Sequence, residues 1–153
     1  MGHGTSGKES KGNSLLMHII LAAGGRLKNP VLKALYDEYK KRLNWKVTLF
    51  EVEGKFALTQ CLPSYTIILD EKGDDLTSNE FARLLETIRS HHQGKVTFII
   101  GGAEGLPQDI KSKANKIISF GKLTWPHLLV RVLLMEQLYR AQQILKGHPY
   151  HRE

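Results

Sequence analysis

Apolar and polar positions alternate along the chain in two distinct periods. Short apolar or β-branched runs predict five strands, at residues 17–24, 46–53, 64–70, 95–102 and 115–120. Helical stripes and helix-start signals predict four helices, at residues 30–43, 78–92, 107–113 and 126–146. Strands that alternate with helices are typical of an α/β domain with a mostly parallel, buried sheet.

Three local signals fix where elements begin and end. Asn29 followed by Pro30 is typical of the first positions of a helix. Thr77 with Glu80 three residues later predicts a capping box at the start of another helix. The stretch EKGDD, residues 71–75, predicts a turn that closes the third strand.

The first 16 residues, MGHGTSGKESKGNSLL, have no hydrophobic period and are rich in Gly and Ser. We expect them to be a disordered leader or a cloning remnant outside the fold. They lack the apolar centre of a secretory signal, and no later segment reaches the roughly 18 apolar residues of a membrane span. Residues 17–153 are therefore predicted to form a single domain, in a protein expected in the cytoplasm.

Charge and cysteine content narrow the class of protein. The 153 residues carry 22 Lys and Arg against 15 acids, a net charge of +7, and the pI is near 9.5. This excess favours a polyanionic partner such as nucleic acid, although charge that serves only solubility is an open alternative. The single cysteine, Cys61, excludes an intrachain disulfide and is interpreted as a small buried hydrophobe.

Three loops follow predicted strands, at the edge where open α/β sheets bind ligands: LDEKG, IGGAEGL and SFGKLTWPH. The glycines of IGGAEGL permit close approach of a ligand to backbone, but the loop matches neither a phosphate-binding loop nor a dinucleotide fingerprint. A tight turn is the alternative interpretation. Glu104 in this loop either orients a ligand amine or simply lies at the start of the next helix, where the helix dipole stabilises an acidic side chain.

The last predicted helix, LLVRVLLMEQLYRAQQIL, is apolar on almost every side. Because a domain of this size has little mass to cover such a helix, a subunit interface is expected. Arg131 within the apolar run requires an anionic partner or access to water. His127 lies four residues earlier on the same helix face, so both side chains are predicted to point at one pocket. At the helix start His127 tends to be neutral and can accept a proton, or it is an ordinary helix-start histidine.

The chain ends in HPYHRE, an aromatic and basic sequence suited to stacking a base and meeting phosphate. Its alternative is a frayed terminus without function. His148 and His151 are spaced to hold a metal, but no third ligand is evident, so no metal is expected. His91 and His92 end a helix and are interpreted as structural.

The segments IGGAEGL, SFGKLTWPHLLVRVLLMEQLYRA and GHPYHRE together resemble the RlmH family. This family comprises the ribosomal large-subunit RNA pseudouridine N3-methyltransferases of the SPOUT class. The resemblance runs from Met17 to Glu153 and is densest from Phe98 onward. It implies a SPOUT-type sheet flanked by helices, with a C-terminal segment threaded into a trefoil knot. It also implies a homodimer with the active site between subunits.

The resemblance further implies S-adenosylmethionine as cofactor, bound in the knot. Carried over by position, the expected cofactor contacts are Leu69, Gly101, Phe120, Gly121, Lys122, Leu123, Thr124 and Trp125.

Five candidate catalytic residues complete the predicted site. His127 or His151 would accept or relay the proton of the imide N3 of pseudouridine. Arg131 and Arg152 would stabilise the developing anion or nearby phosphates, and Tyr150 would stack on or border the base.

The implied substrate is a pseudouridine of 23S rRNA in the helix 69 stem-loop at the subunit interface, methylated on the assembled 70S ribosome. The alternative is a non-catalytic RNA-binding or ribosome-assembly factor that retains a cofactor pocket. A small-molecule enzyme of Rossmann type is a third class, disfavoured by the absent dinucleotide fingerprint. Residues 54–63 form a shorter connection than similar proteins usually carry, which puts the mode of ribosome docking in doubt but not the cofactor site.

Overall fold

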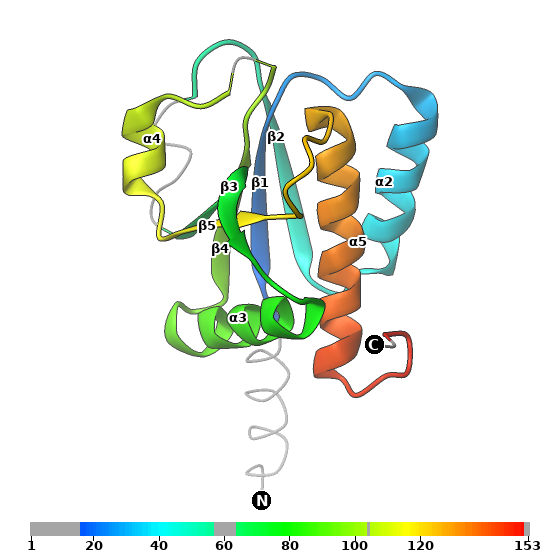
Figure 1. Cartoon of the computed structure of the whole chain (residues 1–153). Coiled ribbons are helices and arrows are strands. Elements are labelled where there is room, and N and C mark those ends of the chain that lie inside the picture. The colour runs from blue at the N-terminus through cyan, green and yellow to red at the C-terminus, as the bar shows by residue number, and fades with distance from the viewer. Residues whose placement is uncertain (1–15, 57–63, 104, 152–153) are drawn as a thin grey trace, which may run out of the picture.

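A five-stranded sheet forms the centre of the molecule in the computed structural model, which describes residues 16–56, 64–103 and 105–151 (Figure 1). The strands are β1 (His18–Gly24), β2 (Lys46–Val52), β3 (Tyr65–Asp75), β4 (Lys95–Ile100) and β5 (Lys116–Ser119). They lie in the order β2-β1-β4-β3-β5, and every neighbouring pair is parallel. The carboxyl ends of the strands therefore share one edge, where ligands bind in sheets of this kind.

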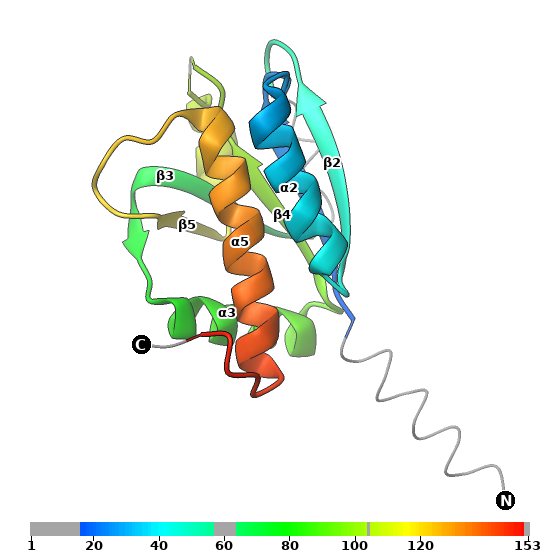
Figure 2. The same ribbon diagram turned by 90° about the vertical axis from the view of Figure 1, so that its right-hand side faces the viewer.

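Four helices flank the sheet: α2 (Pro30–Arg42), α3 (Ser78–His91), α4 (Gln108–Lys113) and α5 (His127–Leu145). Helices α2, α3 and α5 pack on one face of the sheet, with α2 and α5 side by side, and α4 covers part of the other face (Figures 1 and 2). The predicted α/β class with a parallel sheet is confirmed. No helix in the described part of the chain is long and apolar enough to span a membrane.

The predicted helix starts are confirmed. Asn29 Oδ1 accepts hydrogen bonds from the amides of Val31 (2.9 Å) and Leu32 (3.1 Å) at the start of α2. At the start of α3, the Glu80 amide donates to Thr77 Oγ1 (3.1 Å) and the Thr77 amide donates to Glu80 Oε1 (2.9 Å). Each cap satisfies amides that have no partner within the helix, which is worth about 1 kcal/mol.

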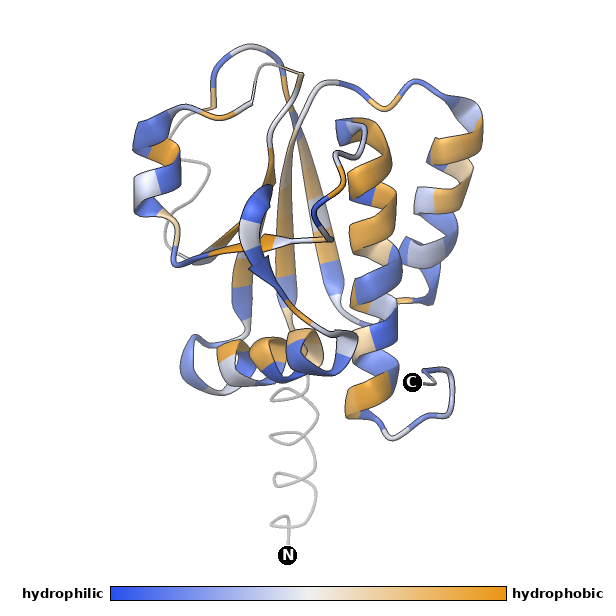
Figure 3. Cartoon of the chain, in the orientation of Figure 1, coloured by the Kyte–Doolittle hydropathy of each residue, from blue (hydrophilic) through white to orange (hydrophobic). Residues whose placement is uncertain are grey.

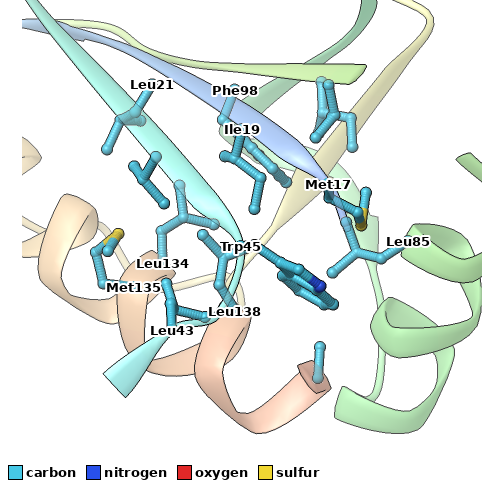
Figure 4. Close-up of a cluster of buried hydrophobic side chains, with 14 of the residues drawn as sticks. Met17, Ile19, Leu21, Leu43, Trp45, Leu85, Phe98, Leu134, Met135 and Leu138 are labelled. Atoms are coloured by element: carbon cyan, nitrogen blue, oxygen red, sulfur yellow. The ribbon is translucent and has the colours of Figure 1, made fainter. Parts of the chain in front are cut away.

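Two apolar clusters hold the layers together. Alternate residues of β1 and β4, such as Ile19 and Phe98, point toward α5, where Leu134 and Leu138 are fully buried (Figure 4). Figure 3 shows the same concentration of apolar residues in the strands and along α5. A smaller cluster on the other face packs Ile110 of α4 against the sheet. Each fully buried large side chain contributes about 1.5–3 kcal/mol.

The predicted turn at residues 71–75 is wrong, because β3 continues through it to Asp75. The strand changes register against β5 between Leu69 and Asp74 and then pairs again with Ile118 and Ser119. Gly73 permits this course, since a Cβ there would lie 2.7 Å from backbone atoms of β5. In Figure 1 the chain leaving β5 passes behind this extended arm of β3 before it reaches α5. The predicted trefoil knot stays a prediction.

The apolar helix α5 is covered largely within the chain itself. It lies between α2 and α3 against the sheet, and eight of its residues are buried. The domain thus covers most of the helix but, as expected from its size, not all of it. Leu128, Leu129, Val130 and Leu133 near its start are only half-buried. The homodimer remains a prediction that these residues support.

Candidate functional site

A cavity of about 340 Å³ opens beside the middle of β3 and the carboxyl ends of β4 and β5. Its walls come from residues 69–71, 100–103, 105–106, 120–121 and 123–125, together with His127 and Val130 of α5. Each of the three loops picked out in the sequence thus contributes to one hollow, as expected for the edge of a parallel sheet. The predicted cofactor residues that line it are Leu69, Gly101, Phe120, Gly121, Leu123, Thr124 and Trp125. Lys122, the eighth, is exposed and lies outside the lining.

Glycines bring two strand ends into direct backbone contact beside the cavity. A Cβ on Gly24 would lie 2.4 Å from the amide nitrogen of Gly102, a distance that real side chains do not reach. A Cβ on Gly101 would lie 3.1 Å from the Leu106 side chain. The Gly105 amide donates to the Gly102 carbonyl at 3.0 Å, so the loop is also a tight turn. The tight-turn interpretation is confirmed. The glycines of this turn also line the cavity, and their contact with a ligand stays a prediction.

The loop between β5 and α5 is held against the arm of β3. Thr124 Oγ1 donates to Glu71 Oε2 at 2.5 Å, and Trp125 Nε1 donates to the Phe120 carbonyl at 3.2 Å. The Ser119 hydroxyl donates to the Gly121 carbonyl. These bonds shape one wall of the cavity from a segment without regular structure.

Two acids line the cavity and are not among the predicted site residues. Asp70 and Glu71 lie in β3 where its register against β5 changes, and the sequence segment LDEKG was the signal that could have found them. The Lys72 amide, and then Lys111 at 3.4 Å, lower the pKa of Asp70 against the opposing effect of burial. An ionised acid in this wall favours a ligand that carries positive charge.

His127 lies at the junction of two cavities. It lines the first and also a neighbouring cavity of about 600 Å³ between the ends of β1 and β2 and the glycine loop. A Cβ on Gly25 would lie 3.5 Å from His127 Nε2, so the imidazole rests against that glycine. The prediction that His127 points into a pocket is confirmed.

The prediction that Arg131 shares this pocket is wrong. Arg131 is fully buried and is absent from the cavity lining. Its Nη1 donates to Glu51 Oε2 at 2.9 Å, and its Nη2 donates to the carbonyls of Gly24 (3.2 Å) and Gly25 (3.0 Å). Arg131 lies on the same side of the helix as His127 but about one turn further along. There, β2 and the carboxyl end of β1 cover it. The predicted anionic partner exists, and it is Glu51.

Arg131 thereby fixes the backbone on which the cavity rests. The two carbonyls that it binds belong to Gly24, which contacts Gly102, and to Gly25, which contacts His127. Burial lowers the pKa of Arg131 while Glu51 opposes that effect, and a guanidinium stays charged in either case. Glu51 Oε2 also accepts the Leu27 amide at 2.7 Å, which ties in the segment after β1. Arg131 therefore affects the site indirectly, by holding the backbone carbonyls of Gly24 and Gly25 in place.

The C-terminal tail packs at the other end of α5. Tyr150 donates to Glu136 Oε1 at 3.2 Å and packs edge-on against Tyr139, with ring centroids 4.8 Å apart. Arg140 donates to His151 Nδ1 at 3.0 Å and to Glu136 Oε1 at 2.5 Å. Burial, and then Glu136, raise the pKa of Tyr150 to about 12. The tail is an ordered assembly of hydrogen bonds.

The described part of the tail, up to His151, does not line the cavity of its own chain. The 19 residues of α5 span roughly 28 Å at the rise of an α-helix, and His127 is the first of them while Tyr150 lies beyond the last. A third cavity of about 400 Å³ beside α5 is lined by Glu136 and shares Trp125 with the first. Arg152 and Glu104 lie outside the described residues, as does Cys61.

Two further predictions concern histidines. His91 Nδ1 lies 3.0 Å from the Thr87 carbonyl, and the His92 ring packs against Tyr65 at 5.0 Å, consistent with structural roles. Among the described residues, no group of three or more His, Cys, Asp or Glu side chains is placed to hold a metal ion.

Comparisons with known proteins agree with the geometry. A family model described as predicted SPOUT methyltransferase matches residues 17–151. Proteins named ribosomal RNA large subunit methyltransferase H are similar along almost the whole chain. The one from Rhodospirillum centenum is 43% identical over 89% of this chain and 99% of its own, and the one from Erythrobacter litoralis is 44% identical over 90% and 99%.

Solved structures share the fold at low identity. A probable methylase family protein from Haemophilus influenzae covers 91% of this chain and 71% of its own, with a TM-score of 0.58 and 11% identity. A probable methyltransferase from Bordetella pertussis covers 89% of this chain and 99% of its own, with a TM-score of 0.54 and 12% identity. On the full-length matches in sequence and the parallel sheet with its strand-end cavity, the chain belongs to the RlmH family of SPOUT methyltransferases.

Proposed function

We propose that this protein is a ribosomal RNA methyltransferase that transfers the methyl group of S-adenosylmethionine to N3 of a pseudouridine. The proposed nucleotide lies in the helix 69 stem-loop of 23S rRNA, and the proposed substrate is the assembled 70S ribosome in the cytoplasm. The observation that carries the proposal is the cavity formed by the three strand-end loops. The relatives named as rRNA methyltransferases and the net charge of +7 support an RNA substrate.

The cavity suits S-adenosylmethionine in shape and in charge. At about 340 Å³ it lies within the range of small-molecule sites, and it mixes apolar walls with a few polar groups. The glycine loop offers backbone without intervening side chains, while Trp125 offers an aromatic surface. Asp70 and Glu71 offer carboxylates to the positive charge of the sulfonium and the amine. When bound, the cofactor supplies an activated methyl group.

The reaction requires a deprotonated N3 aligned with the methyl group, so the protein contributes positioning and the exclusion of water. His127 is the described basic side chain that faces both the cofactor cavity and the adjoining cavity. At this junction a neutral imidazole can accept the N3 proton as the nucleophile approaches. Arg131 keeps this arrangement in place through Gly24 and Gly25 and does not touch the reacting atoms.

The tail residues act across a homodimer in this proposal. Tyr150 and His151 lie far from the cavity of their own chain, but a second copy can present them at it. In that arrangement Tyr150 borders the base, His151 relays the proton, and Arg152 contacts phosphate. The half-buried apolar residues near the start of α5 offer surface for the contact between subunits.

Titration calorimetry with S-adenosylmethionine tests the cofactor half of the proposal. We expect a single site per chain in the wild-type protein and a large loss of affinity in Trp125→Ala. Lys122→Ala is the matched control, because its side chain lies outside the cavity lining. Absence of binding at high micromolar cofactor would contradict the proposal and favour an RNA-binding or ribosome-assembly factor.

Single-turnover methylation of 70S ribosomes tests the roles of the side chains. We expect slower transfer in His127→Ala, His151→Ala, Arg152→Ala and Tyr150→Phe, with cofactor affinity near that of the wild type. A variant that folds, binds the cofactor and transfers at the full rate would remove its residue from the mechanism.

A further inference from the structure

One part of the sheet is left open by the helices. On the face that α4 covers only in part, the edge strand β2 presents Lys46, Thr48 and Phe50. Lys46 and Phe50 are exposed, and half of the Phe50 side chain is accessible. A half-exposed phenylalanine on an edge strand offers an aromatic surface to a partner.

Basic side chains from three neighbouring strands lie side by side on this face, at the amino-terminal ends of the strands. His18 of β1 pairs in register with Lys46 of β2 on one side and with Lys95 of β4 on the other. Residues in register on parallel strands point to the same face, at strand spacings of about 5 Å. We call Lys46, Thr48, Phe50, His18 and Lys95 the open face. None of these three strands contributes an acid to this side of the sheet along the described residues.

The charge of the open face is not balanced. Neither Lys46 nor Lys95 has an acidic partner within 4.0 Å in the described chain. Burial, and then the neighbouring Lys46 and Lys95, lower the pKa of His18. His18 Nε2 lies 3.0 Å from Thr48 Oγ1, which fixes the imidazole against β2. Such a surface complements a polyanion.

The open face leads toward the proposed site of chemistry. Two residues beyond Phe50 on the same side of β2, Val52 enters the wall of the 600 Å³ cavity, followed by Lys55 and Phe56. That cavity ends at His127, which it shares with the cofactor cavity. A strand of nucleic acid along β2 would thus run from a basic end, past an exposed aromatic ring, to the histidine.

We propose that the open face is an RNA-binding surface, on which Phe50 stacks a base and Lys46 and Lys95 contact phosphates of the rRNA strand that leads to the target nucleotide. The proposal rests on the proposed rRNA substrate and adds the path by which the RNA reaches the site. Aromatic side chains on a sheet face, with cations beside them, are how sheet domains bind single-stranded RNA. A protein partner would need a wider apolar patch than one ring.

The test measures ribosome affinity and methylation together. Variants Phe50→Ala and Lys46→Gln/Lys95→Gln are compared with two controls, Val31→Ala, an exposed apolar residue of α2, and Lys113→Gln of α4. Co-sedimentation with 70S ribosomes over a series of salt concentrations gives affinity and its salt dependence. Initial rates give KM for ribosomes and kcat, and calorimetry gives the cofactor Kd.

We expect Phe50→Ala to weaken ribosome binding roughly tenfold, the effect of losing one base stack. The double lysine variant should lose affinity and reduce the salt slope by about two, one for each phosphate contact. Both should raise KM while kcat at saturation and the cofactor Kd stay at wild-type values.

Effects no larger than those of the two controls would overturn the proposed surface. A wild-type protein that binds ribosomes but transfers no methyl group would instead overturn the proposed function, and the binding data would still decide the surface. A wild-type protein that does not bind ribosomes would overturn both.

Discussion

The two ends of α5 differ in how they build a site. At its start, the cavity is shaped by loop backbone, by glycines in contact and by a buried arginine that holds carbonyls. At its end, side chains of Glu136, Arg140, Tyr150 and His151 bind one another through hydrogen bonds. In the proposed mechanism the first end encloses the cofactor and the second meets the RNA base.

This difference is the basis for proposing that the reaction needs two chains. The two ends are roughly 28 Å apart along a rigid helix, so neither can move to the other without unfolding α5. In the proposed homodimer, a closed two-fold arrangement would bring the start of one α5 to the end of the other. The distance between the two ends of α5 is therefore the reason for proposing a homodimer.

The prediction with the largest expected effect tests the proposed homodimer. It mixes two variants that are each inactive alone. His127→Ala and His151→Ala should each slow methyl transfer by a factor on the order of 100 or more, since each removes an acid–base group. After subunit exchange, one site in each mixed dimer has both histidines, so activity should return to about a quarter of the wild-type value.

Transfer rates on 70S ribosomes, measured before and after mixing, check this expectation. A site contained within one chain predicts no recovery at all. Mixing each variant with itself is the control for the exchange procedure.

A second prediction concerns the backbone contact at the first end. Gly24→Ala should destabilise the fold by about 3 kcal/mol and abolish cofactor binding, because its Cβ would lie 2.4 Å from the Gly102 amide nitrogen. Gly54→Ala is the control, since Gly54 has a φ of +79° but open space around it, and should cost about 1 kcal/mol. Denaturant unfolding and calorimetry measure both quantities. Equal costs at the two positions would refute the close contact.

A third prediction compares the arginines of the two ends. Arg131→Met removes the partner of Glu51 and two carbonyl contacts from a fully buried position, and should cost about 2 kcal/mol and weaken cofactor binding. Arg140→Met removes a partly exposed pair with Glu136 and should cost about 1 kcal/mol without changing the cofactor Kd. If cofactor affinity fell in both variants alike, Arg131 would have no special influence on the cavity.

The smallest expected effect concerns Tyr36, whose buried hydroxyl has no hydrogen-bond partner among the described residues. Tyr36→Phe should leave stability near pH 7 within about 1 kcal/mol of the wild type. Burial raises the pKa of Tyr36 from its ordinary value of 10.0 to about 12. The neutral phenol therefore favours the folded state fully below pH 10, and this contribution is lost as the pH rises through 12.

Unfolding experiments between pH 8 and 12 should show a smaller alkaline loss of stability in the Phe variant. Identical alkaline profiles would mean that Tyr36 titrates like an exposed tyrosine. Phe at a buried tyrosine keeps the ring in place, so packing changes little.

Most of the fold follows from local patterns in the sequence. The predictions that fail do so where the structure depends on residues distant in the chain. Strand and helix periods, with the caps at Asn29 and Thr77, predict the elements and the α/β class. The EKGDD segment reads as a turn because its residues are polar and include Gly73. Its extended course depends on β5, which lies more than 40 residues later, so no local signal could reveal it.

The site could also be predicted only in part, because local sequence patterns do not show contacts between distant segments. Strand-end loops and the family resemblance identify most of the cavity wall, because backbone position follows from topology. The direction of Arg131 could not be read from its helix position, since its partner Glu51 belongs to a distant strand. The tail was expected at the site from its chemistry alone, and its distance from the cavity is visible only in three dimensions.

Mass spectrometry of the helix 69 stem-loop tests the central claim most directly. Ribosomes are incubated with the purified protein and S-adenosylmethionine, and the stem-loop fragment is digested to nucleosides. The account predicts one added methyl group, on N3 of a pseudouridine, that is absent without the protein. An unchanged stem-loop, from a protein that binds both cofactor and ribosomes, would contradict it.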